Sequence, residues 1–207
     1  MKLKKSFFQR TYNLNLNLLL LAVLAQLVVF VCEILNSAIS GIHFSPVNPM
    51  LRQIDNTLFL SEHFANTISI SLFIILLTLI TIEFARRIMT DSLWNYFKSV
   101  YQTERLRYFL KQNDDYETVM YDDKHPTLSK KNTIVEAFNQ SVSKCTIDIR
   151  KNSIVVHVKY PRSQQAQALL KEIEPHLLEE ISSRNSSYYF SNQTREGSNL
   201  WICATKR

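Results

Sequence analysis

The sequence predicts an α+β protein in which a two-helix transmembrane hairpin and a long juxtamembrane helix precede a small αββαββ domain with an antiparallel sheet. Three observations lead to this prediction. Two long apolar runs lie in the first half of the chain, helical periodicity continues after the second run, and apolar residues alternate near the C-terminus. The predicted segments are a basic tail at 1–13, transmembrane helices at 14–35 and 64–87 with a short external loop at 36–63 between them, the juxtamembrane helix at 88–112, an acidic linker at 113–131 and the domain at 132–207.

Both apolar runs have the length of a membrane-spanning helix. A span needs about 20 largely apolar residues, and the core of the first run, 18–32, has Gln26 as its one polar residue. The second run is rich in Ser and Thr, whose hydroxyls can bond to the helix backbone. A cleaved signal peptide is the alternative for the first run. Such peptides have an apolar region of about 7–15 residues and a small-residue cleavage site, so we expect two anchoring spans.

Basic residues predict how the hairpin is oriented. The tail carries four of them, whereas the external loop carries only Arg52 against Asp55 and Glu62. Because Lys and Arg accumulate on the cytoplasmic side of spans, we expect a cell-membrane protein with both termini in the cytoplasm. The four inside-positive anchors are Lys2, Lys4, Lys5 and Arg10.

The stretch ITIEFARRIMTD, residues 80–91, marks the predicted cytoplasmic edge of the membrane. Glu83 lies three and four residues before Arg86 and Arg87, so the three share a helical face and a membrane-edge ion pair is expected. The arginine side chains can also reach the lipid headgroups. A functional intramembrane carboxylate is the alternative for Glu83, and the same reasoning applies to Glu33 at the other edge.

The juxtamembrane segment is predicted to continue the second span as one long helix, because neither Gly nor Pro separates them. Its larger side chains recur at steps of three and four and form an amphipathic stripe. Three roles are open for this stripe: packing on the protein's own domain, lying on lipid headgroups, or docking on another protein. The candidate docking face consists of Leu93, Trp94, Phe97, Tyr101 and Tyr108.

The segment 113–131 is acidic, polar and interrupted by Pro126, which predicts a solvated linker with at most a short strand. Its acidic pairs, Asp114–Asp115 and Asp122–Asp123, invite comparison with a calcium loop. Their spacing lacks the alternate-residue ligands and the glycine of such a loop. We therefore expect no calcium site.

The domain begins with a short helix at 132–144, whose start is close to a capping box. Apolar residues then alternate in 145–150 and 153–160, which predicts a β-hairpin with its turn at Lys151–Asn152.

Apolar steps of three and four predict a second domain helix at 163–183, which Pro175 should kink or divide. Two more strands follow at 187–192 and 199–206, joined by a turn that contains Gly197. The result is an antiparallel sheet with its helices packed on one face.

The sequence indicates no catalytic set, no metal site and no cofactor. Its two glycines cannot form a glycine-rich phosphate loop, which argues against a Rossmann or P-loop nucleotide site. Three cysteines without C-x-x-C spacing indicate neither a disulfide framework nor a zinc site, and Cys145 and Cys203 are expected to be buried. We expect His157 on the solvated side of a strand and His176 at a helix surface.

The domain is moderately basic, with ten Lys and Arg against seven Asp and Glu. A candidate surface for a protein partner or nucleic acid gathers around the predicted hairpin. The aromatic residues of RNA-binding sheets are not interleaved with it, which makes nucleic acid the weaker expectation. The surface consists of Arg150, Lys151, Lys159 and Arg162.

The order of these elements resembles a known family. The stretch NTIVEAFNQSVSKCTIDIRKNSIVVHVKYP, the Leu-rich helix after it and the strands in YYFSN and LWICATK follow two spans. This layout resembles the region ahead of the motor in FtsK-like conjugative coupling proteins of Gram-positive mobile elements. Those proteins continue into an ATPase with Walker motifs, which this sequence lacks. The resemblance therefore implies a stand-alone membrane module that recruits or positions a motor ATPase or its DNA.

We therefore expect a non-enzymatic, membrane-anchored scaffold or recruitment subunit of a multi-protein assembly, in DNA transfer by conjugation or in secretion. Its partners would be the lipid bilayer, other protein subunits such as a motor ATPase, copies of itself in a homo- or hetero-oligomer and, more weakly, nucleic acid. A membrane-bound sensor or regulator with a cytoplasmic signalling domain is the alternative, although the external loop offers little to sense. A membrane-bound enzyme that uses His157 or His176 is a third class.

Overall fold

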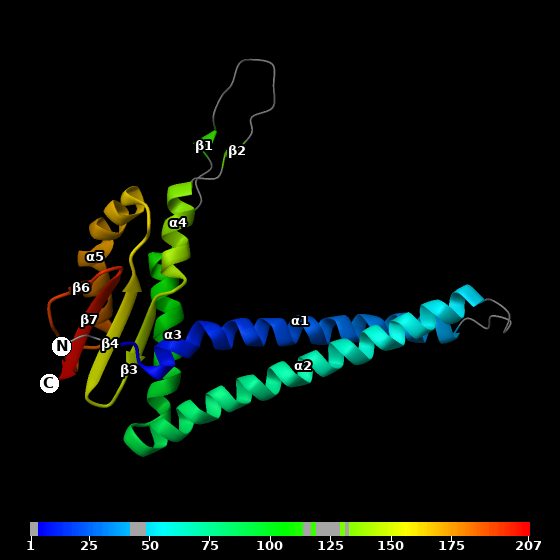
Figure 1. Cartoon of the computed structure of the whole chain (residues 1–207). Coiled ribbons are helices and arrows are strands. Elements are labelled where there is room, and N and C mark those ends of the chain that lie inside the picture. Colours follow the sequence, from blue (N-terminus) through cyan, green and yellow to red (C-terminus); the bar gives the residue numbers. More distant parts are fainter. Residues whose placement is uncertain (1–3, 42–48, 114–116, 119–128, 131–132) are drawn as a thin grey trace, which may run out of the picture. The chain divides into compact units, whose positions relative to one another are not determined.

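The computed structural model describes residues 4–41, 49–113, 117–118, 129–130 and 133–207. These residues form five helices and, near the C-terminus, a five-stranded antiparallel sheet (Figure 1). The predicted α+β class, with two long apolar helices and an antiparallel sheet, is confirmed. The chain divides into two compact units: the helical unit, residues 11–85, and the sheet unit, residues 1–10 together with 86–207.

The helical unit contains most of α1 (Phe7–Gly41) and α2 (Pro49–Thr90), which lie side by side (Figure 1). Ala22 and Ser69 are fully buried where the two helices meet. The Ser69 hydroxyl lies 3.2 Å from both the Ala22 carbonyl and Oε1 of Gln26, to which it can donate. Small side chains let two helix backbones approach this closely. Gln26, the polar residue of the first apolar run, finds its partner in this contact.

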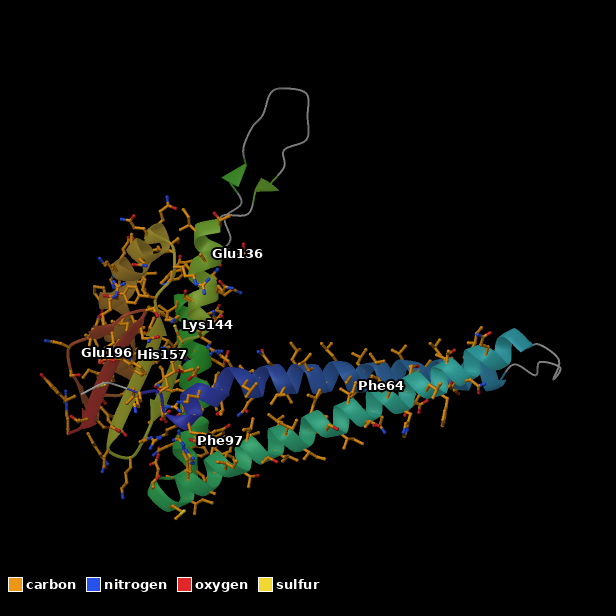
Figure 2. All side chains as sticks on the ribbon, viewed as in Figure 1. Phe64, Phe97, Glu136, Lys144, His157 and Glu196 are labelled. Atoms are coloured by element: carbon orange, nitrogen blue, oxygen red, sulfur yellow. The ribbon has the colours of Figure 1, made fainter. Side chains whose placement is uncertain are left out.

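Most large apolar side chains of the helical unit point outward. Figure 2 shows side chains standing out along both helices, and Leu20, Phe30, Phe64 and Leu77 are each between 59% and 69% exposed. Only 17% of the most apolar stretch of either helix is buried. The core helix of a soluble protein would bury these side chains, because soluble monomers rarely expose apolar patches of this extent. Both helices are long and apolar enough to cross a membrane.

Both helices extend beyond the apolar runs that predicted them. α1 continues to Gly41 and α2 begins at Pro49, so much of the expected external loop at 36–63 is helical, while 42–48 lies outside the described residues. The added turns stay paired, because Asn36 Nδ2 donates to Glu62 Oε2 at 3.0 Å. Hydropathy predicts where lipid contact ends, not where the helix ends, and proline is favoured at the first helical position.

The prediction of one continuous helix from the second span into the juxtamembrane segment is wrong. α2 ends at Thr90 and α3 (Leu93–Leu110) begins after a two-residue break. Ser92 has an extended backbone (φ −115°, ψ 138°), and its hydroxyl accepts a hydrogen bond from the Trp94 N–H. This is the geometry of a helix N-cap, a position that serine favours. The sequence signal for the break was therefore a capping residue and not a glycine or proline.

The sheet has the order β3–β4–β7–β5, with all neighbours antiparallel. β6 also pairs with β7, next to β5, through a two-residue turn in which Gly197 has φ +58°. Such tight turns require positive φ, which glycine adopts without strain. The sequence predicted this segment only as a turn, so β6 is an additional strand. The strands are β3 (Thr146–Ile149), β4 (Ser153–Lys159), β5 (Tyr188–Phe190), β6 (Thr194–Glu196) and β7 (Asn199–Lys206).

The hydrophobic core lies between one face of this sheet and two helices, α4 (Thr133–Val142) and α5 (Gln164–Arg184). α5 runs without interruption through Pro175, which is exposed. The predicted division therefore does not occur, since water can take the place of a hydrogen bond lost on the solvent side. The largest fully buried apolar side chains of the sheet unit include Phe138, Ile154, Val156, Leu170, Leu177 and Ile202.

The predicted linker is described only in part. Within it, β1 (Glu117–Thr118) and β2 (Ser129–Lys130) form a separate antiparallel pair. The acidic pairs that were compared with a calcium loop, Asp114–Asp115 and Asp122–Asp123, lie outside the described residues.

Candidate functional site

Arg87, in the last turn of α2, is 2% exposed and is held by polar contacts to the sheet. Its Nη2 donates to Asp148 Oδ1 at 2.5 Å, and its Nη1 donates to the Ile149 carbonyl at 2.8 Å. Both acceptors belong to the edge of the sheet at β3, and the Asp148 side chain is itself 2% exposed. A buried charge is stable only when it is paired and hydrogen-bonded, and these contacts meet that requirement.

Asp91 and Arg150 extend this buried ion pair into a network. Asp91 lies 3.3 Å from Arg87 Nη1, and its carboxylate also accepts from Asn95 Nδ2 at 2.7 Å and from the Lys151 N–H at 2.9 Å. Arg150 Nε donates to the second oxygen of Asp148 at 3.2 Å. The network therefore joins the end of α2, the start of α3 and the β3–β4 turn.

Aromatic rings from two further elements surround the same guanidinium. The Arg87 side chain lies 5.5 Å from the centre of the Phe8 ring and 5.8 Å from that of Tyr96, and these two rings meet edge to face at 5.6 Å. Arg86, which is exposed, stacks over Phe7 at 4.6 Å. Phe7 and Phe8 begin α1 and belong to the sheet unit. We call Phe8, Arg87, Asp91, Tyr96 and Asp148 the Arg87 junction.

The Arg87 junction therefore brings the first turn of α1 and the last turn of α2 onto one strand of the sheet. Arg87 was predicted to form an ion pair at the membrane edge, but its partners Asp91 and Asp148 were not. Glu83, the predicted partner, is 4% exposed, and its pairing with Arg86 or Arg87 stays a prediction.

The edge of β3 that faces away from β4 is covered by α3. The hydroxyls of Ser99 and Thr103 accept hydrogen bonds from the Ile149 and Ile147 N–H groups at 2.9 and 3.0 Å, and Arg107 Nε donates to the Cys145 carbonyl at 3.0 Å. Four helical residues advance about 6 Å, and two strand residues about 6.6 Å. Polar residues four apart on α3 therefore stay in step with every second residue of β3. Uncovered edges invite pairing with other chains, and α3 prevents it here.

The candidate docking face lies on the opposite side of α3. Trp94, Phe97, Tyr101 and Tyr108 are between 53% and 84% exposed, and Leu93 is half-buried. The helix packs on β3 through a face that carries Ser99, Thr103, Leu106 and Leu110. The aromatic residues therefore do not pack on the protein's own domain.

The predicted basic tail is part of the sheet unit. Gln9 is 5% exposed, and its Nε2 donates to the Val155 carbonyl of β4 at 3.0 Å. Burial and the nearby Lys159 lower the pKa of Lys5. Lys4 and Arg10 are exposed, and Lys2 lies outside the described residues. Within the described part of the predicted tail, Gln9 therefore contacts the sheet.

The prediction that His157 lies on a solvated surface is wrong, because this side chain on β4, which Figure 2 labels, is fully buried. Its ring meets that of Trp201 at 4.9 Å, and Nε2 lies 3.1 Å from Asn199 Oδ1. Burial lowers the pKa of His157 to about 4, although Asn199 acts in the opposite direction. The imidazole is thus neutral near pH 7, where a general base would need a pKa close to that pH.

His157 lies in a row of three buried side chains that cross the sheet in register. It is paired with Thr146 on β3 and with Trp201 on β7. Within the described part of the chain, each of the three has a buried polar atom without a hydrogen-bond partner: Thr146 Oγ1, His157 Nδ1 and Trp201 Nε1. We call these three residues the His157 row.

The structure separates the residues of the candidate partner or nucleic-acid surface. Arg150 and Lys151 precede β4, whereas Lys159 and Arg162 follow or end it, so a strand of seven residues, about 23 Å long, lies between the two pairs. Arg150 is also hydrogen-bonded to Asp148, and Lys159 Nζ donates to Ser198 Oγ at 2.6 Å. These four residues do not form one patch.

No group of three or more His, Cys, Asp or Glu side chains is placed to hold a metal ion within the described ranges. Cys145 is fully buried, as expected, and burial raises the pKa of its thiol to about 11. Cys203 is half-buried, and His176 is exposed on α5. The candidate functional residues are therefore those of the Arg87 junction and of the exposed face of α3.

Comparisons with protein-family models, with curated proteins and with solved structures find no match to this chain.

Proposed function

We propose that this protein is a two-span integral membrane protein of the cell membrane that holds its sheet unit at the cytoplasmic surface. There it would act as a non-enzymatic scaffold or recruitment subunit of a multi-protein assembly. The observation that carries this proposal is the Arg87 junction, in which the ends of both apolar helices bind one strand of the sheet through buried charges. Because the ends of both helices belong to the sheet unit, this unit is tied to the anchor by two segments of the chain and not by one.

The surface of the helical unit supports membrane insertion. Its outward apolar side chains would be unfavourable in water but are matched by lipid. Polar groups between its helices satisfy one another, as Ser69 does with Gln26, which is how interhelical contacts form in a bilayer. The excess of Lys and Arg at the N-terminus and after α2 favours a cytoplasmic location for both termini.

The predicted partners follow from the surfaces that remain free. The aromatic face of α3 is the largest exposed group of such side chains in the sheet unit's helices. The resemblance to the coupling proteins would make a motor ATPase one candidate subunit, and a homo- or hetero-oligomer is equally consistent with these surfaces. Nucleic acid is the weaker candidate, because the four basic residues of the predicted surface lie at opposite ends of β4.

A sensor or regulator is the second candidate function. It is favoured by the same junction, because a displacement of α1 or α2 would reach Asp148 in the sheet directly through Arg87. It is also favoured by the helical turns that extend α2 back to Pro49, which give the outer side more ordered structure than a short loop. In this alternative, the sheet unit would change its contacts in response to the outer side and would not serve as a constant platform.

Three experiments test the proposal. Alkaline carbonate extraction of membranes should leave the full chain in the pellet, and a tag after Arg207 should be digested by protease only in inside-out vesicles. Crosslinking in native membranes followed by mass spectrometry should then capture other subunits or a second copy. A chain that is extracted into the supernatant would contradict membrane insertion. A chain that is inserted but always recovered alone as a monomer would contradict the scaffold.

A further inference from the structure

The outward face of α3 combines aromatic rings with positive charges. One side of the helix carries six exposed residues, each of which lies three or four positions from another member of the set: Trp94, Phe97, Lys98, Tyr101, Arg105 and Tyr108. Arg105 Nη1 donates to the Tyr101 hydroxyl at 2.9 Å. Glu104, at the margin of this face, is paired with Arg107 at 3.2 Å. The centre of the face therefore carries cations and rings but no free carboxylate.

This face cannot become buried by rotation of the helix. The opposite side of α3 is bound to β3 by the hydroxyls of Ser99 and Thr103, and Leu106 and Leu110 belong to the core. Whatever covers the aromatic residues must therefore come from outside the sheet unit.

The same exposed apolar surface continues onto the end of α2. Ile88 and Met89, in its last turn, are 66% and 85% exposed. Trp94 follows Thr90 by four residues, so its Cα lies within about 14 Å of the end of α2. If α2 spans the bilayer, this distance keeps the first turn of α3 at the depth of the headgroups.

We propose that the outward face of α3 lies on the cytoplasmic surface of the bilayer and binds anionic lipid. The proposal rests on the membrane insertion proposed above. Trp and Tyr rings favour the headgroup layer because they are apolar with one polar atom, and Lys98 and Arg105 face the lipid phosphates. The phosphate of a phospholipid is the anion proposed, because the face is continuous with the apolar surface of α2.

The two tryptophans of the chain make a direct test possible. Trp94 is 66% exposed, whereas Trp201 is buried in the sheet at 2%. The full chain is reconstituted into phosphatidylcholine vesicles with phosphatidylglycerol, and the emission of Trp94 is obtained as the difference between the parent protein and Trp94→Phe. Lipids brominated near the top of the acyl chain should reduce the Trp94 signal about twofold and leave Trp201 unchanged, because bromine quenches only nearby rings.

A third variant separates this inference from the proposed function. Leu77→Trp places a ring on the exposed apolar surface of α2, at a position that is 62% exposed. Quenching of this ring by bromolipid, together with a Trp94 that is quenched by aqueous iodide and not by bromolipid, would overturn the inference alone. No quenching of either ring would contradict membrane insertion as well. A Trp94 shielded from both quenchers would mean that a second copy covers the face, and this too would overturn the inference.

The charged residues provide the second arm. Lys98→Gln with Arg105→Gln should raise the access of iodide to Trp94 about twofold in vesicles that contain phosphatidylglycerol, because both cations attract the helix to the anionic surface. The matched control is Lys171→Gln with Arg162→Gln, which removes two exposed cations from α5 and from the loop before it. Equal iodide access in both double variants would overturn the role of lipid phosphate.

Discussion

At the Arg87 junction each buried charge faces an opposite charge, whereas each side chain of the His157 row has a polar atom with no hydrogen-bond partner among the described residues. Both clusters include a residue of β3, and the ion pair of Arg87 and Asp148 is as fully excluded from water as the His157 row. The difference is that the junction joins four elements, while the row lies across three strands that the backbone already holds together. Burial of polar side chains therefore holds four elements together at the Arg87 junction, whereas in the His157 row it lowers the stability of the folded state.

The largest effect is expected at the junction. Arg87→Met should lower the free energy of unfolding of the sheet unit by about 3–5 kcal/mol, because it leaves the buried carboxylate of Asp148 with only the partly exposed Arg150. The measurement is the urea midpoint of the full chain in detergent micelles, followed by the emission of buried Trp201.

Arg86→Met is the matched control, because Arg86 is the neighbouring arginine but is exposed and contacts only the Phe7 ring among the contacts described above. Its loss should cost about 1 kcal/mol or less. Equal midpoints for the two variants would mean that the junction does not hold the helix ends on the sheet.

The next effect is a pH dependence that comes from His157. The folded-state pKa, about 4, lies below the ordinary value of 6.5, so the unfolded chain takes up a proton more readily than the folded one. Stability is therefore complete above about pH 6.5 and falls by up to about 3 kcal/mol as the pH is lowered toward 4. His157→Gln should remove this part of the slope between pH 6.5 and 4.

Other groups also titrate in that range, so the test compares slopes and not absolute stabilities. His176→Gln, which removes an exposed histidine from α5, is the matched control for the substitution itself. A His157→Gln slope that matches the parent would mean that His157 is protonated in the folded protein.

The α+β class, the two apolar helices and the alternating strands could be predicted, because hydrophobic periodicity depends on nearby residues. The alternation of apolar and polar residues predicted which residues share a face of β4. It could not show that His157, on the more polar face, is buried. The contacts on this part of β4 come from distant residues, because Gln9 donates to the Val155 carbonyl across 146 positions. His157 was for this reason placed at the surface.

The candidate site was predictable to a similar degree. Arg87 could be selected from the sequence because it follows an apolar run. Its partner Asp148 could not, because it lies 61 positions away and its place in a strand resembles that of any solvent-facing polar residue. On α3 the periodicity of the large side chains placed Trp94, Phe97 and Tyr101 on one exposed side of the helix, and their role in docking stays a prediction. That polar Ser99 and Thr103 would be the buried side was not predictable, because their partners are backbone groups of a strand edge.

A smaller effect is expected from Thr103→Val, which replaces a fully buried hydroxyl with a methyl group of the same size. The change leaves the Ile147 N–H without its acceptor and should cost about 1–3 kcal/mol. The same urea titration measures it. Unchanged stability would mean that α3 covers the edge of β3 by apolar contact alone.

The smallest effect, and the one that most sharpens the comparison, is expected from Thr146→Val. The chemical change is the same as at Thr103, and Thr146 is also buried, at 1% exposure. Its hydroxyl has no partner in the described structure, so the substitution removes an unsatisfied polar atom and breaks no hydrogen bond. Replacing such a group with an apolar one of the same shape is neutral or stabilising, by about 1 kcal/mol or less. Opposite signs for the two valine variants would show that partners, and not burial, determine what a polar side chain contributes to this sheet. A loss at Thr146 as large as that at Thr103 would mean that its hydroxyl binds a group, such as an ordered water, that the His157 row requires.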